Sequence, residues 1–581
     1  EIIAASLDIS GDIDVDGTTN LDVVDIDGAV NFAADVTLAN GADLITASAG
    51  TSNFRAGVNA GNSIASGGNY NVVVGDEAGT ALTTGDSNIA IGYQALSTED
   101  AGSLSTAIGF QALKVQDVGA GNALNVAVGY QAGALVTTGV QNTLIGGLAG
   151  DALTDADFNT AFGYAALSSD TLGSKSTALG YGSLVTQNFT SATDTYNTAV
   201  GHHAGYHITT GIKNTLVGGL AGDGLTTGNN NTAMGYLSLS ASTTASENSA
   251  FGAGSLNSTT TGTANVAVGQ NAAVTNTTGS NNTAIGQDAL FYNTTGGNNI
   301  AVGLNALSSN TGSFSNVAVG VRALAAFNVT SATSTYNVAV GEDAGASVTT
   351  GVQNTFVGGL AGDATDDGQN NVGVGYGALS ANCGASNTGI GHNALSVCLA
   401  SNNTAVGQNA QVLVTNGAQN TSLGAYALQT TTTGTYNIGI GYNSNSTSAT
   451  ASNQCTLGDA NINNLRCNDQ SISALSDSRD KTDVIDSPYG LNFINTVRPV
   501  QFKWESRDGN VKDGSTRLGF LAQELLAATD GNNAILDLVL DNNPDKLEAK
   551  YGNLLPIAIQ AIQELSAQVE ALTARIETLE G

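Results

Sequence analysis

A glycine recurs every 17 residues through most of this chain, and that spacing limits the folds open to it. Twenty-three such glycines run from Gly75 to Gly458. The step is usually 17, with longer steps of 20 or 21 before Gly129, Gly201 and Gly341 and two steps of 16. A fixed period of this kind is typical of a solenoid, in which each unit must stack on its neighbours to bury its apolar face.

Each repeat carries the same pattern before its glycine, and positions are numbered from that glycine. In the repeat Asn282-Thr283-Ala284-Ile285-Gly286, Asn is at position −4, and it is Asn in twenty of the twenty-three repeats. Position −2 is mostly Ala and position −1 is always apolar. The alternation predicts a short strand with Thr283 and Ile285 on one side and Asn282 and Ala284 on the other. We expect the Ala column to let a second surface approach closely.

The second half of each repeat is predicted to fold back along the first. Ala or Ser at position +3 is followed by Leu or Gly at +4, which indicates a second short strand facing inward, and the rest is rich in turn residues. Stacked coils of this kind form a rod on the order of 100 Å long, at ~4.8 Å per coil. The Asn column is expected to form a ladder of amides between coils, with simple turn geometry as the alternative.

Thin coils filled by Ala and Val enclose little apolar volume, so a single rod would be weakly held. We therefore expect a homo-oligomer, most plausibly a homotrimer. The array resembles the β-roll heads of trimeric autotransporter adhesins and, more closely, the repeat shafts of phage tail fibres. This resemblance implies a mostly β fold, a trimeric fibrous β-roll or β-solenoid of about 17-residue coils, over residues 71–460.

Longer duplications overlie the short period. The segment 138–151 recurs almost unchanged at 210–223 and 350–363, and Thr-Ser-Ala-Thr occurs at 190–193 and 330–333, within two of the long steps. We expect these insertions to bulge from the rod as surface loops.

The charge balance excludes some partners. A net charge of −32 argues against binding to nucleic acid or to anionic membranes, because both need basic surface. No run of 18 apolar residues is present, so no membrane span is predicted. The chain starts at Glu1 without Met or a secretory signal. We expect either that the chain is a piece cut from a longer protein or that an N-terminal anchor, which would bind other tail proteins, is missing.

Residues 1–70 have a different rhythm, with Asp-Val-Asp-Gly at 14–17 and Asp-Ile-Asp-Gly at 25–28 between apolar alternations. Short strands joined by Asp-Gly turns fit a fibrous β-shaft. A calcium site is the alternative, but an EF-hand loop would need a third Asp and a distal Glu. Turn chemistry is the favoured interpretation.

Four cysteines are too few for a disulfide framework. Cys383 and Cys398 lie at nearly equivalent offsets in successive coils, where free buried thiols are expected and a bridge between coils is the alternative. His202, His203 and His207 form a local cluster, and three copies in a trimer could bind a metal. Because adjacent side chains of a strand point to opposite sides, we expect His202 and His203 to be plain surface residues, with no metal or other cofactor.

The composition changes after Gly458. Ten of the sixteen basic residues and the single Trp lie in 476–581. We predict a linker at 461–475 and a small α+β domain at 476–581 that closes in an amphipathic helix from about Leu554. Apolar residues in that helix form a heptad seam: Ile562, Leu565, Val569, Leu572, Ile576 and Leu579. Ile or Val at the a positions with Leu at the d positions favours a two-stranded coiled coil, but fewer than three heptads cannot decide the number of chains in the assembly.

Several motifs follow one another in the last hundred residues. They are Leu-Ser-Asp-Ser-Arg-Asp-Lys at 475–481, Leu-Asn-Phe-Ile and Val-Arg-Pro-Val-Gln-Phe-Lys-Trp within 491–504, Leu-Gly-Phe-Leu-Ala-Gln-Glu-Leu at 518–525, and Leu-Leu-Pro-Ile-Ala-Ile-Gln-Ala-Ile at 554–562. Their order closely resembles the C-terminal intramolecular chaperone domain of phage endosialidases and tail fibres. That domain guides trimer folding and then leaves, after a Ser–Lys pair cuts the bond before the serine.

The resemblance implies that Ser476 is the nucleophile, Lys481 the general base and Leu475–Ser476 the scissile bond. A serine hydroxyl needs an adjacent base, and lysine serves only where burial favours its neutral form. Assembly would therefore switch on cleavage. Asp477 and Asp480 would keep Lys481 charged, so one of them must point away. The implied activity is a single-turnover serine peptidase acting on its own chain.

The sequence thus predicts a trimeric phage tail-fibre protein for host attachment, assembled in the host cytoplasm and carried on the virion. Its receptor would be a glycan or an outer-membrane protein. A bacterial trimeric surface adhesin is one alternative, disfavoured because no C-terminal membrane-barrel strands follow. A glycan-degrading tailspike is another, but no pair of carboxylates suited to glycosidic chemistry stands out.

Overall fold

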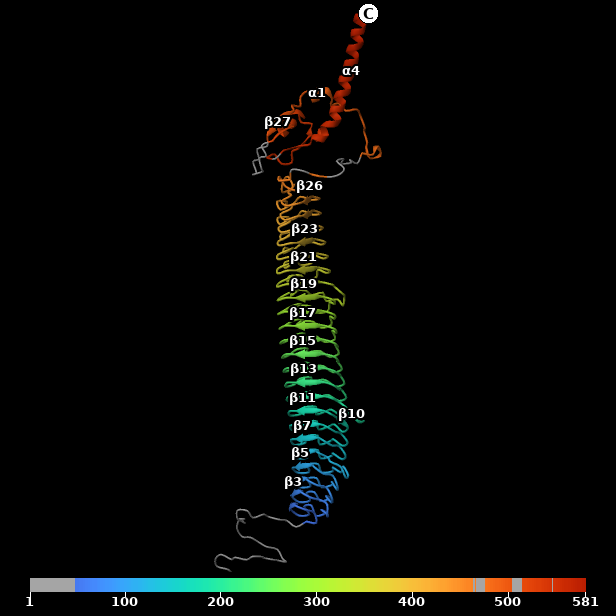
Figure 1. Cartoon of the computed structure of the whole chain (residues 1–581), viewed down its shortest axis with the longest axis vertical. Coiled ribbons are helices and arrows are strands. Elements are labelled where there is room, and N and C mark those ends of the chain that lie inside the picture. Colours follow the sequence, from blue (N-terminus) through green and yellow to red (C-terminus); the bar gives the residue numbers. More distant parts are fainter. Residues whose placement is uncertain (1–47, 463–464, 467–475, 504–514, 546) are drawn as a thin grey trace, which may run out of the picture.

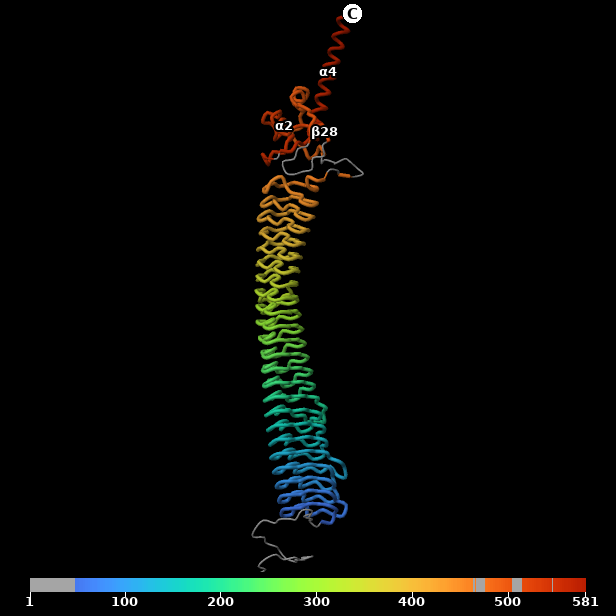
Figure 2. Tube along the Cα trace, turned by 60° about the vertical axis from the view of Figure 1, so that its left-hand side comes forward, coloured from blue at the N-terminus to red at the C-terminus, as the bar shows by residue number. Residues whose placement is uncertain are grey.

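The computed structural model describes residues 48–462, 465–466, 476–503, 515–545 and 547–581. They form a long rod of stacked coils with a small domain at its C-terminal end (Figure 1). The rod curves gently along its length (Figure 2). Among the described residues, no helix combines the length and the apolar character that crossing a bilayer requires.

One parallel sheet of 24 short strands runs the whole length of the rod. Each strand pairs with the equivalent strand of the next coil, so that Ala267 is opposite Ala284 and Ala284 opposite Ala301. The strands are β1 Phe54–Ala56, β2 Val72–Val74, β3 Ile89–Ile91, β4 Thr106–Ile108, β5 Val126–Val128, β6 Thr143–Ile145, β7 Thr160–Phe162, β9 Thr177–Leu179, β11 Thr198–Val200, β12 Thr215–Val217, β13 Thr232–Met234, β14 Ser249–Phe251, β15 Val266–Val268, β16 Thr283–Ile285, β17 Ile300–Val302, β18 Val317–Val319, β19 Val338–Val340, β20 Thr355–Val357, β21 Val372–Val374, β22 Thr388–Ile390, β23 Thr404–Val406, β24 Thr421–Leu423, β25 Ile438–Ile440 and β26 Cys455–Leu457.

The first strand, β1, pairs in register with β2. The sheet therefore reaches into the segment that the sequence assigns to an N-terminal shaft. The two Asp-Gly motifs at 14–17 and 25–28 lie outside the described residues.

The alternation within each strand separates an inner from an outer face. In β16, Ala284 is buried, whereas Thr283 is half-buried and Ile285 is 38% exposed. The Ala column thus faces the interior of the coil, and the second surface that approaches it is the opposite wall of the same coil. A methyl group suffices at this position because the opposite wall of the same thin coil packs against it.

The predicted asparagine ladder is confirmed. The backbone N–H of Asn88 donates to Oδ1 of Asn71 at 2.8 Å, and its own Nδ2 donates to the carbonyl oxygen of Gly102 at 2.9 Å. The same two bonds recur at Asn142. Each amide therefore joins two coils and closes a turn of its own coil, which satisfies buried backbone groups that the three-residue strands leave without partners.

The second strand predicted for each coil is absent among the described repeats. Positions +2 and +4 have left-handed backbone, as in Asp288 with φ 55° and Leu290 with φ 52°. Two left-handed residues so close together turn the chain and prevent an extended strand. Ala289 and Leu290 are nevertheless buried, so the expected inward direction is correct.

The core of most coils holds one large apolar side chain from this turn, in either of two places; the coil after Gly320 holds both, Leu324 and Phe327, and the coil after Gly269 has neither. Where position +4 is Leu290, position +7 is the polar Asn293; where position +4 is Gly150, position +7 is Leu153. Gly150 also makes room for Leu144 of its own strand, since a Cβ at Gly150 would lie 2.8 Å from both leucine side chains. In most coils, a large residue at position +4 is therefore paired with a smaller or polar one at +7, and a glycine at +4 with a large residue at +7, so that the core stays filled.

The insertion before Gly201 leaves the rod on one side (Figure 1). It forms a separate parallel pair between β8 Gly173–Ser174 and β10 Thr193–Asp194. Isolated bridges from Ser103 to Asn122 and from Phe314 to Ser334 lie in the other two long steps. The expected surface loops are confirmed, and each is tied to the coil below it.

The C-terminal domain is small and mixed. Its elements are η1 Ser478–Asp480, α1 Leu491–Ile494, β27 Val500–Lys503, β28 Thr516–Gly519, α2 Ala522–Ala528, α3 Asn533–Leu536, β29 Val539–Leu540, β30 Glu548–Ala549, η2 Tyr551–Asn553 and α4 Leu554–Glu580. The pairs β27–β28 and β29–β30 are antiparallel. Leu525, Leu538 and Val539 form its core with Leu554 and Ile557 of α4. Beyond that core α4 projects away from the rod (Figure 1).

Candidate functional site

The predicted serine and lysine are in contact. The Nζ atom of Lys481 donates to Oγ of Ser476 at 2.5 Å. The 3₁₀ turn η1 lies between the two residues and reverses the chain there, so that Lys481 comes back to Ser476. Leu475, on the other side of the proposed scissile bond, lies outside the described residues.

The acidic neighbours of this pair matter because they could hold the lysine in its charged form. Asp477 caps η1 by accepting from the N–H of Arg479 at 2.9 Å, and its carboxylate also accepts from the guanidinium Nε at 3.0 Å. Arg479 holds the pKa of Asp477 below its usual value. The Asp477 carboxylate thus bonds Arg479 and not Lys481. This agrees with the prediction that one of the two acids points away from Lys481.

Both Ser476 and Lys481 are exposed in the single chain. Water stabilises an exposed ammonium, and a lysine acts as a base only where burial disfavours its charge. The described chain thus holds a preformed contact between a hydroxyl and an amine that are both open to solvent.

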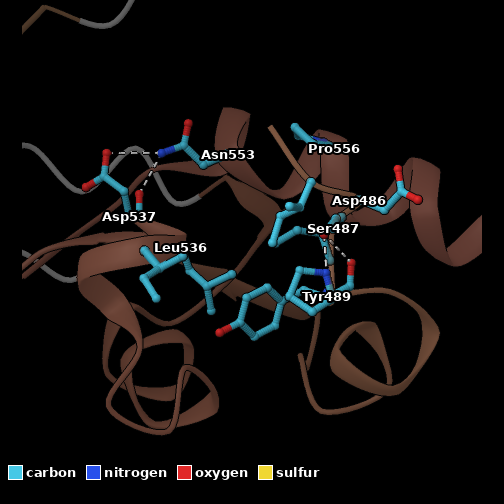
Figure 3. Close-up of a pocket in the computed structure, with 11 residues that line it drawn as sticks. Asp486, Ser487, Tyr489, Leu536, Asp537, Asn553 and Pro556 are labelled. Carbon is cyan, nitrogen blue, oxygen red and sulfur yellow. Dashed lines mark hydrogen bonds between the residues drawn. The ribbon is translucent and has the colours of Figure 1, made fainter. Parts of the chain in front are cut away.

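A groove of about 530 Å³ lies in the same domain, lined by the segment that follows the Ser–Lys turn (Figure 3). Tyr489 and Leu536 form part of its wall, and Asp537 and Asn553 lie at one end. The Asn553 amide donates to the backbone oxygen of Asp537 at 2.7 Å. Sequence reasoning missed this groove, because its residues come from three separated segments, 485–489, 535–537 and 553–557, that carry no motif in common.

The separate C-terminal motifs converge in the structure. Arg498, just before β27, forms a two-pronged ion pair with Glu524 of α2, with 2.9 Å between Nε and Oε2. The N–H of Leu491, at the start of α1, donates to Glu564 of α4 at 2.7 Å. The first contact joins the motif around Arg498 to the motif 518–525, and the second joins the motif at Leu491 to α4 just beyond the motif 554–562.

The histidine cluster differs from the prediction. His202 and His203 follow a strand and lie in a turn, where their rings stack with centroids 3.9 Å apart, so the expectation of opposite directions is wrong. His207 hydrogen-bonds through Nδ1 to the backbone oxygen of Asp223 at 2.8 Å. Burial, aided by the charge of His202, lowers the pKa of His203. Within the described ranges, no group of three or more His, Cys, Asp or Glu residues is arranged to hold a metal ion.

The cysteines Cys383 and Cys398 are free and buried. Burial raises the pKa of the Cys398 thiol to about 11. A buried thiol of this kind is a poor nucleophile.

Comparison with known families identifies the C-terminal region. Residues 476–534 match the family described as the chaperone of endosialidase. The match begins at Ser476, the residue whose side chain contacts Lys481. A β-solenoid of about 17-residue coils that ends in such a domain fits a tail fibre with a C-terminal chaperone domain, which confirms the resemblance drawn from the sequence. No curated protein matches the chain.

Proposed function

We propose that this chain is a subunit of a homotrimeric phage tail fibre whose C-terminal domain assists assembly and then cuts itself off before Ser476. The observation that carries this proposal is the Ser476–Lys481 contact at the first residue of the chaperone match. A fixed contact between a hydroxyl and an amine has no evident structural purpose on an exposed turn, but it is what nucleophilic catalysis requires.

The proposed reaction uses the two side chains in sequence. Lys481, once neutral, takes the hydroxyl proton as Ser476 Oγ attacks the carbonyl carbon of Leu475. An ester forms, the amide C–N bond breaks, and the proton passes to the departing nitrogen of residue 476. Water then hydrolyses the ester, which leaves a carboxylate on Leu475 and a free amine on Ser476.

Assembly supplies the switch in this proposal. Ser476 and Lys481 are exposed in one chain, so the amine is stabilised in its charged form by water. Packing of neighbouring copies around the turn would exclude that water and favour the neutral amine. Cleavage would then follow correct assembly and not precede it, which suits a domain that acts once.

The rod would serve as the attachment organelle of the particle. Its insertions reach solvent on one side of the array, as at β10 (Figure 1), and they offer the irregular surface on which binding residues are commonly placed. Contact with a host receptor, a glycan or an outer-membrane protein, is assigned to these loops or to the tip that cleavage exposes. The N-terminal side of the chain would join other tail proteins.

Intact mass measurement tests the proposal. The purified wild-type protein should give two masses under denaturing conditions, with a cut directly before residue 476, and Ser476→Ala should give only the uncut mass. Ser478→Ala, two residues away and equally exposed, is the matched control and should be cut normally. Cleavage of the Ser476→Ala protein at the same bond would show that the serine is not the nucleophile.

A further inference from the structure

The outer face of the large sheet is uncharged from β2 to β26, with an apolar residue at position −1 of every repeat and Thr, Ser or an apolar residue at nearly every position −3. Positions −3 and −1 point outward in every coil, and no strand from β2 to β26 of this sheet carries a charged residue. Large side chains at position −1 are left open to solvent, such as Phe162 at 54% and Leu423 at 52% exposure. In a chain with a net charge of −32, a long uncharged stripe is the surface that most needs an explanation.

The two edges of this face differ. Along the edge at position +1, rings stack from coil to coil, with centroids 5.3 Å apart between Tyr93 and Phe110 and between Phe110 and Tyr130. A second stack joins Tyr164 to Tyr181 at 5.5 Å. Along the edge at position −5, the exposed apolar residues are scattered: Tyr70, Leu104, Leu124, Phe158, Tyr196, Tyr336 and Tyr436. In the N-terminal part of the rod the +1 edge is therefore rich in rings, whereas farther along it also holds polar residues such as Gln270, Gln287 and Glu342. At the −5 edge apolar residues are interspersed among polar ones throughout.

The turns at positions +8 and +9 have the opposite character. Threonine hydroxyls there bond to the next coil, as Thr137 Oγ1 donates to the carbonyl oxygen of Thr154 at 3.2 Å and Thr154 to that of Thr171 at 3.0 Å. The hydroxyls on this side thus find partners within their own chain. Only the sheet face combines apolar character with exposure along the full array of described coils.

The size of the face suits a permanent interface. With 24 strands at ~4.8 Å spacing, and roughly 10 Å between its edges, the face covers on the order of 1,000 Å². Stable interfaces bury about 800 Å² on each partner, whereas a free monomer surface rarely exposes an apolar patch beyond a few hundred Å². The face is therefore large enough to hold partner chains by itself.

The occupant that best fits is the same chain. A partner must present uncharged apolar surface over the same length and with the same coil spacing, and another copy in parallel register does so coil by coil. The seam of α4 gives a second indication, because Ile562, Leu565 and Val569 are exposed at the far end of the same molecule. A parallel bundle covers the sheet face and the seam with one symmetry axis.

We propose that the sheet face is the interface between copies, with the +1 edge of each chain against the −5 edge of the next around a threefold axis. The inference rests on the homotrimer of the proposed function and specifies which surface forms it. The different edges fit threefold packing, because a cyclic trimer joins two unlike surfaces at each contact, whereas a twofold dimer joins like to like.

Site-specific photo-crosslinking tests this arrangement in the full chain. p-Benzoylphenylalanine in place of Ile285, on the outer face of β16, should give covalent dimers and trimers on a denaturing gel after irradiation. The same group in place of Thr295, exposed in the turn of the same coil, should give none. Sedimentation of the unirradiated protein reports the number of copies independently.

The outcomes separate this inference from the proposed function. If the protein sediments as three copies but residue 285 gives no crosslink, or both positions crosslink equally, the interface lies elsewhere and the inference is wrong, while the trimer stands. If the protein sediments as a single copy, both fail. A double variant, Ile285→Glu with Phe251→Glu, should lose the covalent trimer formed through a benzoylphenylalanine at Val268, whereas the control Thr261→Glu with Thr295→Glu should keep it.

Discussion

Glu99 accepts a hydrogen bond of 2.8 Å from the side-chain amide of Gln116, and both residues are fully buried. The amide also donates to Ser105 at 2.8 Å, and its oxygen accepts from Asn125 at 2.8 Å. Ser105 interrupts the asparagine ladder at the coil before a long step. The same arrangement recurs at Asp170, Gln187, Ser176 and Asn197, before the next long step. At two of the three insertions, an acid, a glutamine and a serine thus form the hydrogen bonds that continue the ladder to the next asparagine.

Glu99→Gln should loosen the first insertion. The Glu99 carboxylate accepts from Gln116 and from the N–H of Gly102 at 2.7 Å, so an amide there would bring one N–H against another donor. We expect a loss of about 1–3 kcal/mol in local stability, the usual effect of leaving a buried polar group unpaired. Hydrogen exchange of the amides in residues 102–125 should therefore rise by roughly tenfold or more.

The matched control is Glu77→Gln, because Glu77 accepts from Gln94 at 2.7 Å across the same 17-residue step but is only half-buried. Its exchange should change little. Equal effects of the two substitutions would contradict a special role for the buried pair.

Leu144→Ala should open a cavity in the rod. Its side chain fills the space that Gly133 and Gly150 leave empty, since a Cβ at Gly133 would lie 2.7 Å from it. Removal of a buried leucine side chain costs about 2–5 kcal/mol. Local hydrogen exchange in the coils on either side measures the loss.

A compensating variant checks the cause. Leu144→Ala combined with Gly150→Leu and Leu153→Asn reproduces the arrangement of Ala284, Leu290 and Asn293 in another coil. This triple variant should regain most of the protection. If its amides exchange as fast as those of the single variant, the pairing of large and small residues at these positions does not govern the packing.

The buried thiols should resist alkylation. Burial raises the pKa of Cys398 to about 11, so only about one molecule in a thousand carries the thiolate at pH 8. Iodoacetamide should therefore label the exposed Cys455 in the folded protein and leave Cys383 and Cys398 unlabelled. Between pH 9.0, the ordinary pKa of a thiol, and about pH 11, the Cys398 thiol loses its proton in the unfolded chain but keeps it in the folded chain. The free energy of unfolding should therefore fall as the pH rises through that window.

Peptide mass spectrometry after labelling measures the result, with labelling in denaturant as the control for total thiol. A peptide pair linked through Cys383 and Cys398 would instead reveal the bridge left open by the sequence.

Lys481→Arg should block the cut. The guanidinium keeps the positive charge and the reach to Ser476 but stays protonated in proteins, so it cannot accept the hydroxyl proton. Intact mass should show only the full-length chain. Arg479→Lys is the control, because it keeps the ion pair to Asp477 and should be cut. Cleavage in the Lys481→Arg protein would exclude lysine as the base.

Glu564→Ala should free the start of α1. The carboxylate accepts from the N–H of Leu491 at 2.7 Å and packs against Gly490, where a Cβ would lie 2.1 Å from the carboxylate oxygen. Loss of a hydrogen bond to a charged group costs about 1.5–3 kcal/mol. Exchange of the Leu491 amide should rise accordingly, and Glu570→Ala, exposed further along α4, should leave it unchanged.

The array was predictable where a single chemical requirement recurs. The strand before each glycine, the asparagine ladder and the surface insertions follow from period, alternation and amide chemistry. The second strand was wrong because Leu290 and its equivalents occupy left-handed backbone, which side-chain pattern alone does not reveal. The small residue at Ala284 predicted close approach of a second surface, but the pattern does not tell that this surface is the opposite wall of the same coil.

The candidate site was predictable only through the order of the C-terminal motifs. A serine five residues before a lysine is common, and the contact depends on the turn at Ser478–Asp480, which Asp477 caps. The groove beside Tyr489 and the stack of His202 on His203 depend on turns and long-range contacts, which have no counterpart in local sequence.

The parallel register of the coils has a consequence for how such rods change length over generations. The duplicated segments 138–151 and 210–223 occupy equivalent positions in their coils. Recombination between the two would delete four whole coils and rejoin the remainder in phase, with both ends of the molecule intact. A gene built in this way encodes a rod whose length can decrease or increase by whole coils in a single recombination event.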